Sequence, residues 1–360
     1  MKNNLTNYLS SVYRAEQELV DAKASLMTTS NKRYCDIPSD MTSEELEIFN
    51  QAIQDMGYSG LHVGLTSLWN KPDMHYISAI KKIGFGATHG TSVKWQLRTG
   101  RSYEEAVRND KRTIDDLDPT EQIPLNYDLF AGNVSQTLSN NMDREHIKNA
   151  KLLMTALQLK KEKEGAFAVM RYIVQTVAQV FKDSKRTVVF EVPGTLGFSM
   201  FPNPNQFKQI HKLVISLFPG ALFCVDVGHL LTWREAGLPL KKLINSLIPL
   251  RGSIRMIHIS SAGSRNENFK RAYKIAFGEG IPDWHIHGLD LMLAVHEEEM
   301  LTVIHAIRNM ESKSGLIEVC ETRKPSAAIA DYFGQTHKGE FDDSKYIMSL
   351  KLQSKLLGYC

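Results

Sequence analysis

Several apolar segments in the second half of the chain run directly into acidic residues or histidines. Glu191, Asp226 and His258 each end one such segment, and Glu318 and Glu321 belong to the last of them. A buried carboxylate without a partner is strongly unfavourable, so a residue such as Asp226 needs a cation, a hydrogen-bond donor or a metal nearby. Carboxylate oxygens and imidazole nitrogens are typical ligands of Zn, Mn and Co. Because several segments end in this way, we predict a shared metal site rather than separate helix caps and ion pairs.

Strand-like and helix-like segments alternate from about residue 58 onward, which favours βα units and a parallel sheet. The fold class we predict is α/β, a (β/α)8 TIM barrel over residues 58–335. An open doubly wound sheet is the alternative, but the chain lacks a GxGxxG turn and its polar strand ends come from several strands. We expect residues 1–57 to form an N-terminal helical extension and 336–360 a C-terminal helical tail. The predicted strands are 58–65, 187–192, 221–227, 254–260 and 315–321, with weaker candidates at 84–90, 123–130 and 151–159.

The composition of the 360 residues is that of a soluble globular protein, with 42% hydrophobic and 23% charged residues. No apolar run approaches the length of a membrane span, and the polar N-terminus does not resemble a secretory signal. The four scattered cysteines form no disulfide framework. These features predict an intracellular, cytoplasmic protein without a membrane partner. A net charge of +3 permits a nucleic-acid partner but does not argue for one.

Five motifs together resemble the endonuclease IV family of apurinic/apyrimidinic endonucleases, within the xylose-isomerase-like TIM barrels. The resemblance covers about residues 58–330 and is stronger in its second half. The motifs are VVFEVPGTLG, CVDVGH, IHISSAGSR, FGEGIP and ETRKP.

The resemblance implies that Glu191, Asp226, His258 and Glu321 are metal ligands. Glu321 is preferred over Glu318 because a threonine and a proline follow it in the family's order. Two glutamates separated by an odd number of residues also cannot face the same side of a strand. His229 matches a histidine that ligates another zinc in endonuclease IV. Glu191, Glu321 and His229 are therefore also the candidate catalytic residues.

The sequence also departs from the family pattern. Endonuclease IV holds three zinc ions with two further histidines from its third and fourth strands, and the strands predicted at 123–130 and 151–159 contain no histidine. Its Asp-x-His after the Gly-Ser-Arg loop is missing as well. Asp283 and His285 have that spacing but follow the Gly-Glu-Gly turn rather than precede it. We therefore expect one or two divalent ions rather than three, with Zn first and Mn or Co as alternatives.

Candidate substrate-binding residues lie in two loops. Arg265 could reach a phosphate or sugar oxygen, or it could pair with a nearby acid. Residues 94–101 form a basic segment with an aromatic residue that could follow a nucleic-acid backbone, or could be a solvated loop. His62 and His89, at the ends of early strands, could line the same rim. The residues assigned to substrate binding are Arg265, Lys94, Trp95 and Arg98.

These features support three functions. The favoured one is a metal-dependent phosphodiesterase, a hydrolase that cleaves DNA at abasic or damaged sites. The second is a single-metal sugar isomerase or epimerase, in which Glu191 and Glu321 relay a proton at carbon and a small sugar replaces DNA as the partner. The third is a catalytically silent barrel with a binding or structural role.

Overall fold

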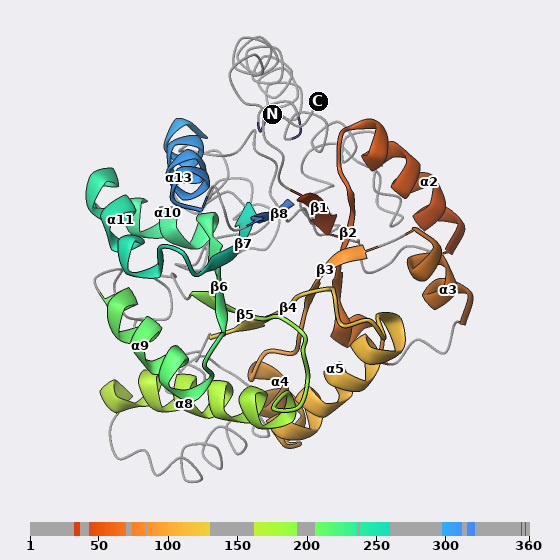
Figure 1. Ribbon diagram of the computed structural model, residues 1–360, viewed down its shortest axis with the longest axis horizontal. Coiled ribbons are helices and arrows are strands. Elements are labelled where there is room, and N and C mark those ends of the chain that lie inside the picture. The colour runs from red at the N-terminus through yellow and green to blue at the C-terminus, as the bar shows by residue number, and fades with distance from the viewer. Residues whose placement is uncertain are drawn as a thin grey trace, which may run out of the picture.

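Eight parallel strands close into one barrel in the computed structural model, and helices surround the strands (Figure 1). The (β/α)8 TIM barrel prediction is thus confirmed. The structure describes residues 32–36, 43–69, 74–83, 85–129, 162–192, 206–235, 238–259, 297–311 and 315–320, together with Ser354 and Leu357. The strands are β1 (Lys32–Asp36), β2 (Gly60–Gly64), β3 (Phe85–His89), β4 (Leu125–Asp128), β5 (Val188–Val192), β6 (Leu222–Asp226), β7 (Ile254–Ile259) and β8 (Ile317–Cys320).

The described helices follow the strands in the alternation expected of this fold. Their apolar faces pack on the outside of the barrel, as the spacing of buried residues along α5 illustrates. None of the described helices is both long and apolar enough to cross a membrane. The helices are α2 (Ser43–Asp55), η2 (Leu65–Ser67), α3 (Met74–Ile83), α4 (Lys94–Thr99), α5 (Tyr103–Leu117), α8 (Glu162–Val180), α9 (Phe207–Leu217), α10 (Val227–Glu235), α11 (Leu240–Ser246), η4 (Ile248–Leu250) and α13 (Glu297–Met310).

The barrel begins earlier in the chain than the sequence predicted. β1 lies inside residues 1–57 and pairs with both β2 and β8, so the predicted boundary at residue 58 is wrong. The search for apolar runs did not reveal β1, because this strand contains Lys32, Arg33 and Asp36. Its Tyr34 is buried in the barrel. Residues 1–31, and all of 336–360 except Ser354 and Leu357, lie outside the described residues, so the predicted helical extension and tail stay predictions there.

This early strand shifts the order of those that follow. GLHVG is the second strand, FGATH the third and LNYD the fourth. β4 pairs directly with β5, with Asp128 opposite Glu191, so the barrel closes without the weak candidate at 151–159. That segment lies outside the described residues.

Alternation along the strands separates two apolar clusters. One cluster fills the space between strands and helices and includes Phe190 and Phe223. The other fills the barrel interior, and its members are Tyr34, Ala87, Val189, Cys224, Met256, Ile317 and Val319. Strands buried on both faces explain why β5 reads as a continuous apolar run.

A buried carboxylate joins α5 to the turn after β3. Asp110 is fully buried and accepts hydrogen bonds from the backbone N–H of Thr91 at 2.7 Å and from its hydroxyl at 3.0 Å. Gly90, one residue earlier, packs against the ring of Tyr127 on β4 so closely that a side chain would not fit. Asp110 and Tyr127 together fix the backbone that follows His89.

We expect Gly90→Ala to destabilise the protein by about 1–3 kcal/mol, because overpacked buried sites cannot relax freely. A Cβ at Gly90 would lie 2.3 Å from Cε1 of Tyr127, and Tyr127 is fully buried. Gly64, at the end of β2, is the matched control, since a Cβ there meets nothing within 4 Å. Urea unfolding of both variants checks the prediction, and equal stabilities would contradict it.

Burial raises the pKa of Asp110 to about 7 despite its bonds to Thr91. An unfolded Asp titrates near about 3.9, so between about pH 4 and 7 the native state holds one proton more than the unfolded state. Stability therefore falls as pH rises through this window, by about 1.4 kcal/mol per pH unit. Asp110→Asn removes the titrating carboxyl group and therefore this pH-dependent part of the free energy of unfolding. In urea unfolding, the stability of the wild type relative to the variant should fall from pH 5 to 7 at about that slope. Parallel pH profiles for the two proteins would refute the assignment.

Candidate metal centre

The polar residues of the candidate site lie directly beyond the layer of apolar residues that fills the barrel interior. Side chains two residues apart on a strand share a face, so the residue two positions after each interior apolar residue also points inward. In β3, β5, β6 and β7 these next inward residues are His89, Glu191, Asp226 and His258. All four lie toward the C-terminal ends of their strands, where the active sites of TIM barrels are found.

Glu191 is the centre of the cluster. It is 5% exposed, and its Oε2 lies 3.1 Å from Nδ1 of His258 and 3.7 Å from Nε2 of His89. Its Oε1 lies 3.4 Å from Nδ1 of His229. The side-chain amide of Asn126 on β4 donates a hydrogen bond to Oε2 at 2.9 Å. Burial alone would raise the pKa of Glu191, but His258, His89 and His229 outweigh it and hold that pKa well below its usual value.

Asp128 is a donor that sequence reasoning missed, and His89, expected only to line the rim, is a second donor of the cluster. Nε2 of His89 lies 3.1 Å from Oδ1 of Asp128, and both side chains approach Glu191. The statement that the third and fourth strands lack a histidine is therefore wrong for the third, because β3 ends in His89. The fourth, β4, ends in Asp128 instead. The shift in strand order caused the error.

The orientation of His89 suits a metal ligand. Its Nδ1 lies 2.8 Å from the carbonyl oxygen of Gly90, so Nδ1 carries the proton and Nε2 faces the carboxylates. Burial lowers the pKa of His89, but Asp128 and Glu191 outweigh that effect and raise it well above the usual value. A proton on Nε2 thus balances the carboxylates in the place that a cation would take.

Asp226 and His229 form the opposite side of the cluster. Asp226 directly precedes α10, and its Oδ1 accepts a hydrogen bond from the backbone N–H of His229 at 3.0 Å, as a helix cap does. Its Oδ2 lies 3.4 Å from Nε2 of His229. One carboxylate therefore both begins the helix and faces the cluster.

The cluster contains groups of three donors whose ligand atoms lie within 4.8 Å of one another. One group is His89, Asp128 and Glu191, and another is Glu191, Asp226 and His229. Such mixed imidazole and carboxylate sets fit a divalent metal. A third group joins Glu191 and His258 with Cys224. Burial raises the pKa of the Cys224 thiol to about 12, and Cys224 lies in the apolar layer below the cluster.

The other predicted metal ligand is Glu321, which lies outside the described residues. Val319 faces the barrel interior, so its neighbour Glu318 points away from that interior. Glu318 instead forms a two-point ion pair with Arg308 of α13, at 2.7 and 2.6 Å, and does not join the described groups. Arg265, Asp283 and His285 also fall outside the described residues.

The segment expected to be a basic loop is in fact the short helix α4. Trp95 is half-buried, and its ring lies 5.6 Å from that of Trp69. The side chains of Lys94 and Arg98 are not among those described. His62, a candidate for the rim, is buried and lies with its ring 5.3 Å from that of His258, so it borders the cluster from below.

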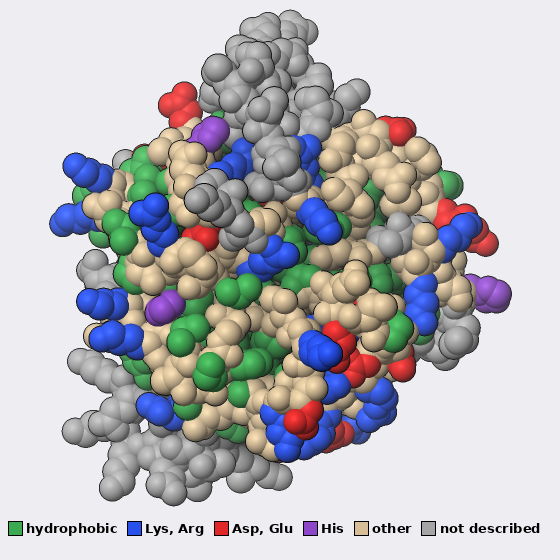
Figure 2. Space-filling model, in the orientation of Figure 1, with side chains coloured by type: hydrophobic (Ala, Val, Ile, Leu, Met, Phe, Trp, Pro, Cys, Tyr) green, Lys and Arg blue, Asp and Glu red, His purple; other side chains and the backbone are tan. Residues whose placement is uncertain are grey.

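Basic side chains do not gather in a single patch on the face shown in Figure 2. Lys and Arg lie scattered over this face, near its middle as well as around its edge, with Asp and Glu among them at the lower right (Figure 2). This distribution agrees with the modest net charge of +3.

The sequence matches no protein-family model and no curated protein. Solved structures do resemble it. One is a putative xylose isomerase from Rhodospirillum rubrum, with a TM-score of 0.54, 12% identity, and coverage of 91% of this chain and 98% of that one. The chain therefore shares the (β/α)8 barrel fold of that protein.

Two further structures carry functional names. A D-allulose 3-epimerase from Methylomonas sp. has a TM-score of 0.50 and 11% identity, covering 92% of this chain and 98% of that one. A family 2 AP endonuclease from Brucella melitensis has a TM-score of 0.45 and 13% identity, covering 80% of this chain and 92% of that one. At such identities the similarity establishes the fold alone.

We expect Asn126→Ala to lower the affinity for Zn by about 10-fold or more, because residues that orient a ligand typically contribute this much. The variant loses the bond that holds Oε2 of Glu191. Thr88→Ala is the matched control, since its hydroxyl bonds only to the carbonyl of Pro124 among the described residues. Calorimetric titration with Zn measures both. If Asn126→Ala binds Zn as tightly as the wild type does, Zn binding does not depend on the hydrogen bond from Asn126 to Glu191.

Proposed function

We propose that the chain is a metal-dependent phosphodiesterase that cleaves DNA at abasic or damaged sites. The observation that carries this proposal is the position of Glu191 between two donor groups, one with His89 and Asp128 and the other with Asp226 and His229. A carboxylate shared in this way suits two cations placed close together, as in many enzymes that cleave phosphodiesters. We infer two Zn ions, with Mn as the alternative.

Divalent cations bound there would supply Lewis acidity to a phosphodiester and activate a water molecule for attack on phosphorus. The residues of the chain would hold these cations and fix their positions. Glu191 stays ionised, because His258, His89 and His229 surround it and keep its pKa low. His89 and Asp128 are 23% and 22% exposed, whereas Glu191 is 5% exposed. The substrate therefore approaches on the side of β3 and β4.

The surroundings of Glu191 argue against the epimerase alternative. A base that relays a proton at carbon needs an oxygen directed at the substrate and a pKa near the working pH. Both oxygens of Glu191 instead lie within 3.7 Å of an imidazole nitrogen, one of them also accepting from Asn126. These contacts favour a role for Glu191 in holding cations over one in exchanging protons with a sugar.

We expect Glu191→Gln to reduce nicking of a duplex with one abasic site by about 100-fold or more, because it removes a charge central to the reacting group. Glu47→Gln is the matched control. Glu47 is an exposed α2 residue that pairs with Lys82, and this change should leave the rate unaltered. The assay uses Zn- or Mn-loaded protein and separates nicked from intact strands.

Elemental analysis complements this assay. About two ions per chain in the wild type and about one in His89→Ala would agree with two donor groups that share Glu191. No nicking by the loaded wild type, or conversion of a ketose that depends on Glu191, would overturn the proposal.

A further inference from the structure

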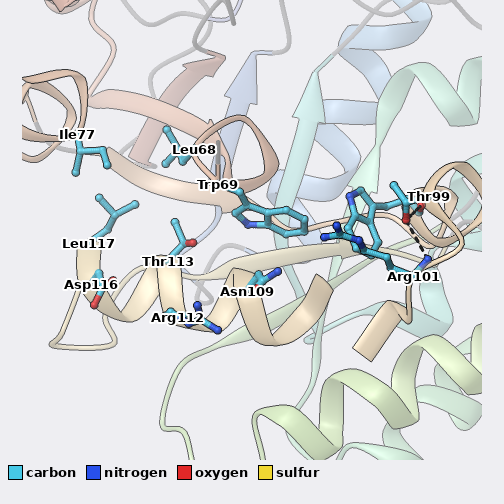
Figure 3. Close-up of a pocket in the computed structure, with 11 residues that line it drawn as sticks. Leu68, Trp69, Ile77, Thr99, Arg101, Asn109, Arg112, Thr113, Asp116 and Leu117 are labelled. Atoms are coloured by element: carbon cyan, nitrogen blue, oxygen red, sulfur yellow. Dashed lines mark hydrogen bonds between the residues drawn. The ribbon is translucent and has the colours of Figure 1, made fainter. Parts of the chain in front are cut away.

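A groove of about 700 Å³ runs along the outer flank of the barrel, between η2 and α3 on one side and α4 and α5 on the other (Figure 3). Trp69 and Trp95 line it, and Arg101, Asn109 and Arg112 are among its polar lining residues. None of these residues belongs to the described metal-ligand groups. The groove combines aromatic surface with guanidinium groups.

The two tryptophans are held firmly. Their ring centroids lie 5.6 Å apart at an interplanar angle of 83°, an edge-to-face arrangement. Both rings are half-buried and pack against the main apolar cluster. A rigid indole that remains partly exposed offers a planar aromatic ligand a stacking surface at little entropic cost.

The charges in the groove favour an anion. Arg112 is exposed, and no described carboxylate lies within ion-pair distance of it. Arg101 is 66% exposed and only loosely paired with Glu105, at 3.8 Å. Asp116 also lines the groove, one turn of α5 after Arg112, and offsets part of this positive charge. By contrast, Arg108 on the same helix forms a close pair with Glu104 at 2.6 Å and does not line the groove.

The two tryptophans of the groove and the candidate metal centre lie toward the same end of the barrel. Trp69 follows β2 and η2, and Trp95 follows β3, so both lie beyond the C-terminal ends of neighbouring strands. The metal centre occupies the same end of the barrel, and its most exposed described residues, His89 and Asp128, end β3 and β4. A polymer that crosses the centre can therefore continue into the groove.

We propose that this groove binds nucleotides of single-stranded DNA beside the metal centre. A base stacks on the exposed indole surface, and Arg101 and Arg112 contact the phosphates on either side of it. Asn109 offers an amide to the base edge. The choice of DNA as the polymer rests on the proposed function, whereas the site itself is separate from the metal ligands. Aromatic stacking combined with guanidinium groups is the usual chemistry of single-strand binding.

The experiment titrates a short oligo-dT into the protein in EDTA and follows tryptophan fluorescence at several salt concentrations. We expect quenching in the wild type and binding about 10-fold weaker in Trp69→Leu, since stacking contributes about this much per base. Arg112→Ser should lower the slope of log Kd against log salt by about 0.7, the value for one lost contact with a single strand. Arg108→Ser is the matched control and should bind as the wild type does.

Three outcomes would overturn the proposal that the groove binds single-stranded DNA. They are no binding of oligo-dT, equal binding by Arg112→Ser and Arg108→Ser, or binding of an acidic peptide in place of oligo-dT. Arg112 is exposed, so its variant tests the groove even if Trp69→Leu fails to fold. The nicking assay separates the two proposals. If the protein nicks DNA but its binding of oligo-dT does not depend on Arg112, only the proposed single-strand site is rejected. If binding depends on Arg112 but the protein does not nick DNA, only the proposed phosphodiesterase activity is rejected.

Discussion

Repulsion between carboxylates at the barrel rim is the constraint on which the rest of the site depends. Asp128, Glu191 and Asp226 end three consecutive strands, each hydrogen-bonded to its neighbours, so the acids cannot move apart. Their charges must be balanced where they stand. Imidazoles do this by alternating with the acids, with His89 between Asp128 and Glu191 and His229 between Glu191 and Asp226. The same arrangement that balances the charges creates the donor groups.

The layers around the cluster keep this balance in place. Below it, protonated Cys224 and apolar residues such as Val189 and Met256 exclude water and strengthen the interactions above them. Beside it, Asn126 fixes one oxygen of Glu191, and the Gly90 carbonyl fixes the proton on His89. That carbonyl is held in turn by the contact of Gly90 with Tyr127 and by the bonds from Thr91 to Asp110. The position of a candidate ligand such as His89 thus depends on packing one and two residues further along the chain.

The sequence identified Glu191, Asp226 and His258 as site candidates because β5, β6 and β7 are buried on both faces. Continuous apolar runs made the polar residue at each end conspicuous. β1 and β4 gave no such signal, since KRYCD is mostly polar and LNYD is only four residues long. The role of Asp128 depends on its register opposite Glu191, which local pattern does not encode. The groove likewise depends on a contact between Trp69 and Trp95 that requires η2 and α4 both to pack on α5.

The aspartate at the end of β4 has a consequence for the charge of the whole site. Each of the two groups that meet at Glu191 contains one imidazole and two carboxylates, so the described cluster holds three carboxylates in all. Two divalent cations would carry four positive charges against these three, or against four if Glu321 joins them. A histidine in place of Asp128 would leave the site more positive and bind a phosphodiester more tightly before and after cleavage. In the proposed phosphodiesterase the aspartate would keep a donor at this position and lower the positive charge of the site, which would weaken its hold on a cleaved anionic product.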